Sequence, residues 1–64
     1  MSKLANMRKE LGLSQAALAD ASDVSVRMIQ KYEQGAKDIN KAEAMTIYRM
    51  ARVLGCLMED LIEL

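Results

Sequence analysis

The stretch SQAALADASDVSVRMIQKYEQG, residues 14–35, decides the fold. Ser14 and Ser25 each stand directly before a helical pattern, where serine commonly caps the first turn of a helix. The first pattern runs to about Ser22 and the second to about Gln34. Two helices of about eight and ten residues, joined by a three-residue turn, are typical of a helix-turn-helix. The stretch therefore predicts that motif.

The residues around the turn support this interpretation. Asp23 stands where the backbone is expected to be left-handed, a conformation that Asp tolerates better than most non-glycine residues. Ala19 is small enough for the two helices to approach closely where they cross, and Val24 is expected to fill the corner. The inner face of the first helix is predicted to consist of Ala17, Leu18 and Ala21.

The second helix has two different faces when its residues are projected at about 100° each. Met28, Ile29 and Tyr32 fall on the inner face. The outer face carries no acid and consists of Val26, Arg27, Gln30, Lys31 and Gln34. Arg or Lys can donate to guanine, Gln can pair with adenine, and a small apolar group can contact a thymine methyl. The same composition also suits an ordinary solvated helix face, so the helix by itself leaves both readings open.

The whole chain reads as a single all-α domain over residues 1–64, with five helices joined by short connections. Besides the two central helices, three further helices are expected at residues 3–11, 41–54 and 58–64. The residues predicted to face inward from the first and fourth of the five are Leu4, Met7, Leu11, Ala44, Ile47, Tyr48, Ala51 and Leu54. The four methionines expected in the core are Met7, Met28, Met45 and Met50, and both tyrosines are expected there as well.

Net charge is zero, yet the charge is unevenly distributed. Residues 1–41 carry seven basic and five acidic side chains, whereas residues 42–64 carry two basic and four acidic ones. A polyanion site is therefore expected in the first two-thirds of the chain. No apolar run reaches the roughly 18 residues of a membrane span, and the start does not resemble a signal peptide. With Cys56 as its one cysteine, expected to be buried packing, the chain is predicted to be cytoplasmic.

The sequence resembles the lambda-repressor-like helix-turn-helix family, also called the Cro/repressor or xenobiotic-response-element type. The resemblance rests on LGLSQAALA (11–19), VS (24–25), IQKYEQG (29–35) and LGCLMEDL (54–61), and so extends over nearly the whole chain. It implies a compact five-helix domain whose third helix enters the DNA major groove. In such a domain Glu33 ties down a neighbouring loop.

Residue by residue, the resemblance implies two sets of DNA contacts. The base-reading set is Ser25, Val26, Arg27, Gln30 and Lys31. The phosphate-binding set is Ser14, Gln15, Gln34 and Lys37, extended by Asn40 and Lys41 at the expected start of the fourth helix. The sequence departs from the family's pattern in three places. Asp23 replaces a turn glycine, the loop before the fourth helix lacks a proline, and Leu57 replaces a capping Ser or Thr.

These features predict a sequence-specific double-stranded DNA-binding transcription regulator, a prokaryotic or phage repressor that acts on an operator. One module this small buries too little DNA surface for tight binding, so a homodimer is expected. The apolar C-terminal end is the candidate interface, with Leu57, Met58, Leu61 and Leu64. The alternative is an antitoxin-type or protein-interaction helix-turn-helix module with a second protein as partner. The absence of His, of metal-ligand spacing and of a glycine-rich phosphate loop argues against an enzyme, a metal or a cofactor.

Overall fold

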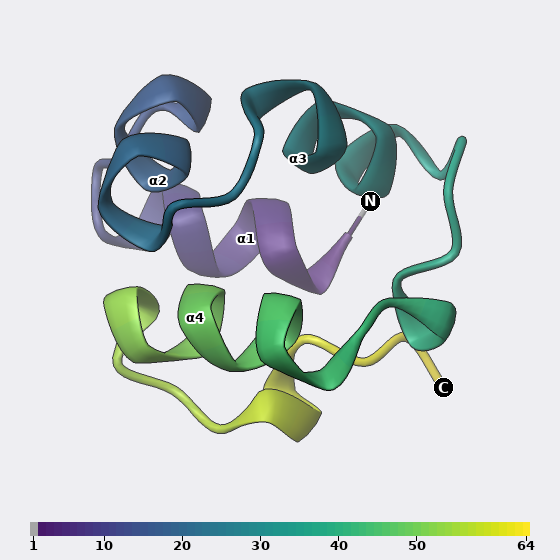
Figure 1. Cartoon of the computed structure of the whole chain (residues 1–64). Coiled ribbons are helices and arrows are strands. Elements are labelled where there is room, and N and C mark those ends of the chain that lie inside the picture. The colour runs from purple at the N-terminus through teal and green to yellow at the C-terminus, as the bar shows by residue number, and fades with distance from the viewer. Residues whose placement is uncertain (1) are drawn as a thin grey trace.

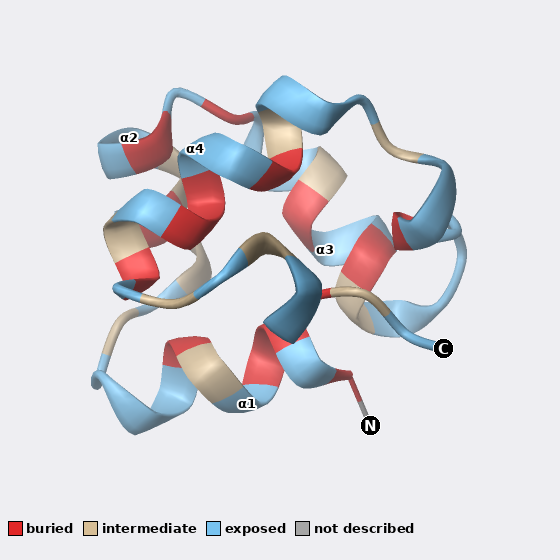
Figure 2. Cartoon of the chain, turned by 90° about the horizontal axis from the view of Figure 1, so that it is seen from below, coloured by how far each residue is buried: buried red, intermediate tan, exposed pale blue. Residues whose placement is uncertain are grey.

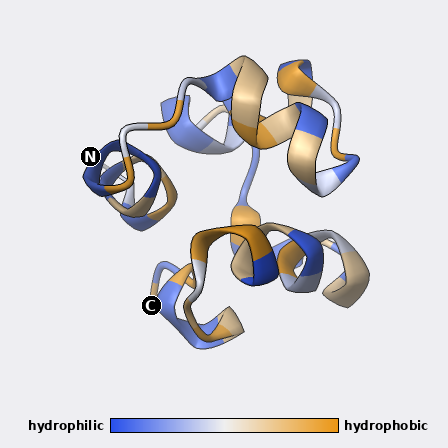
Figure 3. Ribbon diagram, turned by 90° about the vertical axis from the view of Figure 1, so that its left-hand side faces the viewer, coloured by the Kyte–Doolittle hydropathy of each residue, from blue (hydrophilic) through white to orange (hydrophobic). Residues whose placement is uncertain are grey.

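The computed structural model describes residues 2–64, a helical chain without a β-strand in that range (Figure 1). Its elements are α1 (Lys3–Glu10), α2 (Gln15–Ser22), α3 (Val26–Gln34), η1 (Ile39–Lys41), α4 (Ala44–Leu54) and η2 (Met58–Asp60), the two η elements being single 3-10 turns. In Figures 1 and 3, α2 and α3 lie above α4 and η2, with α1 at a height between them. The all-α prediction is confirmed, but the predicted count of five helices is wrong.

The helix-turn-helix forms where its local signals predict it. The Ser14 hydroxyl accepts a hydrogen bond from the amide of Ala17 (3.0 Å), and the Ser25 hydroxyl accepts one from the amide of Arg27 (3.2 Å). Asp23 ends α2 in the left-handed conformation, with φ 56° and ψ 38°. Both predicted caps and the predicted turn geometry are thereby confirmed.

The fourth helix begins later than predicted. The Asp38 carboxylate caps a separate 3-10 turn by accepting from the amide of Asn40 (3.0 Å). Ile39 anchors that turn in the core, and the backbone is extended again at Ala42. A helix cannot continue through an extended residue, so α4 starts only at Ala44. Asn40 and Lys41 consequently lie outside the first turn of α4, contrary to prediction.

The predicted fifth helix is one turn long because its backbone groups bind elsewhere. The Leu57 amide donates to the Asp60 carboxylate (2.9 Å), which starts the turn. Three residues after the turn, the Glu63 amide donates to the Asn40 side-chain oxygen (2.8 Å), and the Glu63 carbonyl accepts from the Asn40 amide group (3.0 Å). These two bonds tie Glu63 to η1, and no helix forms over residues 61–64.

The core joins α1, α2, α3, η1 and α4 with Leu61, which follows η2, mainly through aliphatic side chains (Figure 2). Its fully buried members are Leu4, Leu18, Ile29, Met50 and Leu61. Tyr32 is buried among them, and Met7, Met28 and Cys56 pack against the cluster while partly exposed. Bands of hydrophilic and hydrophobic residues alternate along the helices in Figure 3, as expected of helices with one buried side.

Several residues predicted to face inward are exposed. In α2, Ala17 and Ala21 face solvent, and Ser22 is buried instead, its hydroxyl donating to the Leu18 carbonyl (2.6 Å). Leu11 at the end of α1 is exposed as well. In α4 the inward arc is formed by Ile47, Met50, Ala51 and Leu54. That arc leaves Ala44, Met45 (54% exposed) and Tyr48 (41% exposed) outside.

No helix in residues 2–64 combines the length and the apolar character that crossing a membrane requires.

Candidate nucleic-acid interface

The outer face of α3 is the best-defined polar surface of the chain. Met28, Ile29 and Tyr32 point inward and are buried or partly buried, as predicted. The predicted outer set is exposed throughout: Val26, Arg27, Gln30, Lys31 and Gln34. Ser25 is exposed at the start of the helix, where its oxygen accepts the capping bond and its O–H remains a donor. The face thus presents donors and one small apolar group, with no acid among them.

The α2–α3 corner fixes the direction in which this face points. Val24 is buried in the corner, and its amide donates to the Ala19 carbonyl (3.2 Å). Ala19 is partly buried against the core, which agrees with its predicted place at the helix crossing. The left-handed Asp23 brings the chain back toward α2 so that α3 packs across it.

A buried ion pair supports α3 from below. The Arg8 guanidinium donates two hydrogen bonds to the Glu33 carboxylate, from Nε at 2.7 Å and from Nη2 at 2.8 Å. The two side chains are only 11% and 6% exposed, respectively. Arg8 Nη1 also donates to the carbonyl of Leu13 (2.8 Å) in the loop between α1 and α2. Glu33 therefore has the structural role predicted for it, and it reaches that loop through Arg8.

Gln15 completes this network. Its amide nitrogen donates to the Glu33 carboxylate (3.0 Å), which fixes the side chain at the start of α2. Burial alone would raise the pKa of Glu33, but the hydrogen bonds from Arg8 and Gln15 and the charge of Arg8 outweigh it and lower the pKa below 4.5. The carboxylate therefore stays charged near neutral pH. An amide nitrogen carries two hydrogens, so Gln15 keeps one donor for a ligand.

Gln15 and Gln34, although 19 positions apart, line the same shallow hollow of about 250 Å³. Lys9, from the last turn of α1, lines it too and adds a positive charge that the sequence reading missed. Ser14 is exposed beside Gln15, and Lys37 is exposed beyond the end of α3. These residues bring donors from three different elements to one edge of the α3 face.

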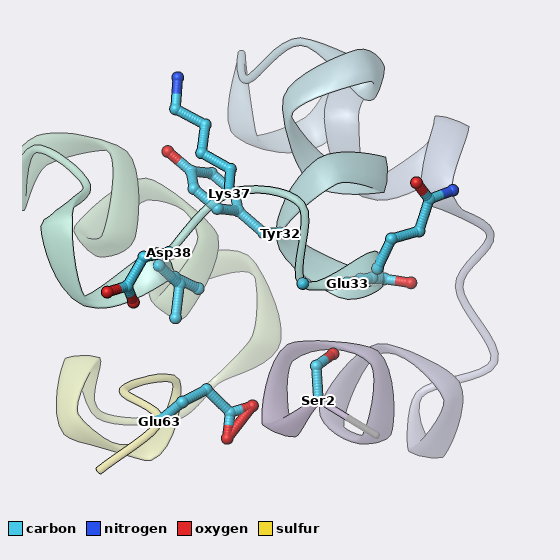
Figure 4. A pocket seen from close by; sticks show the side chains of 9 residues that line it. Ser2, Tyr32, Glu33, Lys37, Asp38 and Glu63 are labelled. Carbon is cyan, nitrogen blue, oxygen red and sulfur yellow. The ribbon is translucent and has the colours of Figure 1, made fainter.

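The hollow on the other side of Gln34 has a different character. It has a volume of about 420 Å³ and is lined by Lys37 but also by Asp38 and Glu63 (Figure 4). The Glu63 carboxylate accepts from the backbone amide of Lys3 at the start of α1 (2.7 Å), and in the figure the Lys37 amine points away from both acids. Carboxylates repel phosphate, so this hollow is unfavourable for a nucleic-acid backbone.

The structure changes the roles predicted for Asn40 and for one of the C-terminal leucines. The Asn40 side chain holds the backbone of Glu63 through both its oxygen and its nitrogen, which leaves one amide hydrogen for any other partner. Lys41 is exposed. Leu61 is fully buried in the core of its own chain and therefore cannot be part of a dimer surface. Leu57 and Leu64 are exposed, and Met58 is half-buried.

The sequence analysis singled out neither Arg8, which holds Glu33, nor Lys9, which lines the hollow beside Gln15. Arg8 follows Leu4 by four positions and thus lies on the inward stripe of α1, where an arginine requires an acidic partner. Its place on the inward stripe was therefore the signal that could have identified Arg8 as one half of a buried ion pair. Lys9 carried no comparable signal, because an exposed lysine near a helix end is common.

The crossing of α2 and α3, with an exposed acid-free face on the second helix, defines a helix-turn-helix DNA-binding domain. A family model described as helix-turn-helix matches residues 4–61. The chain belongs to that family, the lambda-repressor and Cro-like helix-turn-helix proteins, and is a DNA-binding regulator. No curated protein matches the sequence.

Proposed function

We propose that this protein is a sequence-specific regulator of transcription, a prokaryotic or phage repressor that occupies a double-stranded operator. The observation that carries the proposal is the outer face of α3, whose five side chains are all exposed and include no acid. An acid-free face with two cations can enter a groove bordered by phosphates without electrostatic penalty. The buried Arg8–Glu33 ion pair ties α3 to α1 and so supports the position of this face.

The proposed base contacts divide by chemistry. Arg27 and Lys31 lie one turn apart and can each donate to the acceptors of guanine. Gln30 can pair with adenine, and Val26 offers an apolar contact to a thymine methyl. Ser25 lies at the margin of the groove, where its free O–H can reach a base or a phosphate. These five residues form the proposed specificity set.

The proposed phosphate contacts lie around the same helix. Ser14 and Gln15 on α2, Gln34 at the end of α3 and Lys37 beyond it can donate to backbone oxygens, with Lys9 as an additional cation. Asn40 and Lys41 are retained as weaker members, because Asn40 is largely engaged with Glu63. A sequence-independent clamp of this kind positions α3 over the base pairs without specifying them.

The operator is proposed to contain two half-sites, occupied by a homodimer of this chain. A single module of this size buries only about 600–1,000 Å² of surface on DNA, which is too little for tight specific binding. Two copies on half-sites about one helical turn apart double the contact. Leu57, Met58 and Leu64 are the residues proposed to contribute to the contact between copies.

Selection of bound duplexes from a random pool tests this function. We expect a short enriched motif, and an affinity that falls steeply with salt because phosphates are neutralised. The selection is repeated with Arg49→Ala, a cation on α4 outside the proposed site, which should yield the same motif. A pool without enrichment, together with no shift of random duplexes at low salt, would refute DNA binding.

A second candidate function is that of an antitoxin-type or protein-interaction module. It is favoured by the exposed apolar side chains of Leu57 and Leu64 and by the zero net charge of the chain. Co-purification with the product of a neighbouring gene, combined with a failure to bind any duplex, would favour this alternative. Binding of both DNA and such a product would indicate an antitoxin.

A further inference from the structure

The surface between α4 and η2 contains an apolar groove with no part in the proposed DNA contacts. It has a volume of about 290 Å³. Ala51 forms its floor, Tyr48 and Arg52 border it on α4, and Leu57 and Glu59 border it on the η2 side. Leu57 is 62% exposed at the edge of this groove, where its own chain leaves most of the side chain uncovered.

The two walls of the groove carry opposite charges. Arg52 lies over the Tyr48 ring, with its guanidinium carbon 5.8 Å from the ring centroid, and donates to the Tyr48 hydroxyl (2.9 Å). These contacts hold the guanidinium at one rim. Glu59 lines the other side. Within residues 2–64 the one ion pair closer than 4.0 Å is that of Arg8 and Glu33, so Arg52 and Glu59 each lack a partner of opposite charge.

This arrangement is complementary to itself. In a contact with two-fold symmetry, each residue of one copy meets a different residue of the other, and the reverse pair forms as well. A groove with an arginine on one wall and a glutamate on the other can therefore make two equivalent ion pairs with a second copy. A protruding leucine beside an apolar groove supplies the matching apolar contact.

We infer that the groove between α4 and η2 binds a second copy of this chain, with Leu57 of each copy in the groove of the other and Arg52 of each paired with Glu59 of the other. This inference deepens the homodimer of the proposed function, yet the association needs no DNA. Because the groove is small, the dimer is a weak and reversible one.

Charge reversal tests the reciprocal pair. Sedimentation of the wild type over a concentration series should show association, and Arg52→Glu and Glu59→Arg should each weaken it by at least about tenfold. An equimolar mixture of the two variants should associate as a heterodimer, because one ion pair then keeps its original orientation and the other is restored in reversed orientation. The double variant Arg52→Glu/Glu59→Arg should associate with itself.

Arg49→Glu is the matched control. Arg49 is exposed on the same helix but does not line the groove, so the same charge change should leave the association constant within about threefold. Alkylation of Cys56, which does line the groove, gives a second measurement: the thiol should react more slowly as association proceeds. Helical content is compared among the variants to confirm that each is folded.

Two results would overturn the inference. One is a wild type that stays monomeric at every concentration with no change in Cys56 reactivity. The other is a mixture of Arg52→Glu and Glu59→Arg that associates no better than either variant alone. The DNA function is tested separately, because a monomer can still enrich a single half-site in the selection experiment. Failure of the dimer and failure of DNA binding are thus distinguishable.

Discussion

The outer faces of α3 and α4 show how the same helical spacing serves two chemistries. The α3 face carries two cations, two amides and one small apolar side chain, whereas the exposed stripe of α4 combines Met45 and Tyr48 with Arg49 and Arg52. Glu33 of α3 forms a buried ion pair with Arg8, whereas the buried residues of α4 are all apolar. The first face suits a charged groove and the second suits another protein surface.

This difference also separates two kinds of stability. The position of α3 depends on a charged group that cannot be left alone in the interior, so it is sensitive to single substitutions and to pH. The position of α4 depends on many small apolar contacts, each of which contributes modestly. Substitutions that affect one of these helices and spare the other therefore distinguish the two kinds of stability.

Removing one partner of the buried pair should have the largest effect. Arg8→Met is expected to lower the free energy of unfolding by about 3–5 kcal/mol, because Glu33 is then left buried with only Gln15 to compensate it. Urea denaturation measures the loss, with Arg49→Met on the exposed face of α4 as control. The double variant Arg8→Met/Glu33→Leu should lose less free energy of unfolding than the sum of the losses of Arg8→Met and Glu33→Leu. A loss below about 1 kcal/mol for Arg8→Met would show that the pair does not hold α3.

The same pair should make stability depend on pH. The pKa of Glu33 is lower in the folded protein than its ordinary value of 4.5, so its stabilisation is complete above that value and is lost as pH falls through the folded-state pKa. The effect should be smaller than that of Arg8→Met, since a protonated carboxyl can still form hydrogen bonds. Unfolding free energies of wild type and Glu33→Gln should converge as the solution is acidified. A constant difference between them would contradict the lowered pKa.

Arg27→Ala should break sequence reading without affecting the fold. Arg27 is exposed and one turn from Lys31, and loss of its contact should cost about 1–3 kcal/mol at the base pair that it reads. Repeating the site selection with this variant should relax one or two positions of each half-site. An unchanged motif would mean that Arg27 contacts only phosphate or solvent.

The two halves of the molecule also differ in how far they follow from sequence. The helix boundaries within residues 14–35 were predicted to within a residue, because the caps and the left-handed turn depend on neighbours a few positions away. The shortness of the last helix was missed because the bonds between Asn40 and Glu63 join residues 23 positions apart, whereas the late start of α4 follows from the Asp38 cap and the extended backbone at Ala42. No local sequence pattern predicts a contact between residues so far apart.

Within the candidate site the same distinction holds. Projection of α3 identified its exposed face, since a regular helix fixes the directions of its side chains. The network of Arg8, Glu33 and Gln15 joins three helices. The resemblance implied the structural role of Glu33, whereas its partner Arg8 was missed although it lies on the inward stripe of α1. The inward placement of Tyr48 was wrong because the buried arc of α4 is shifted toward Met50, which is fully buried, and this shift leaves Tyr48 at the exposed edge.

Gln15→Ala should weaken DNA binding by about 1 kcal/mol, equally for operator and scrambled duplexes, because phosphates carry no sequence information. Gln15 is neutral, so the slope of affinity against salt should not change. Lys37→Ala, by contrast, should reduce that slope by about 1. Affinity measured at several salt concentrations separates the two. A loss confined to the operator would contradict the phosphate role of Gln15.

Leu57→Ser should produce the smallest effect on stability, and it acts on α4 and η2 alone. Half of a capping box is already present, because the Asp60 carboxylate accepts from the amide of residue 57. A serine there could accept from the amide of Asp60 in return, which should raise the free energy of unfolding of the monomer by about 1 kcal/mol. Little is lost in exchange, since most of the Leu57 side chain is exposed in the monomer.

The same substitution should weaken self-association, because it removes the apolar group proposed to enter the groove of the second copy and introduces a hydroxyl that needs a partner. Leu11→Ser serves as control, since Leu11 is an exposed leucine at the end of α1 that does not line the groove and has no part in the proposed contact. Thermal melts at low concentration report the monomer, and sedimentation at high concentration reports the dimer. A variant that melts higher and associates as well as the wild type would leave Leu57 as nothing more than a poor cap. A variant that melts higher and associates less would assign Leu57 to the contact between copies.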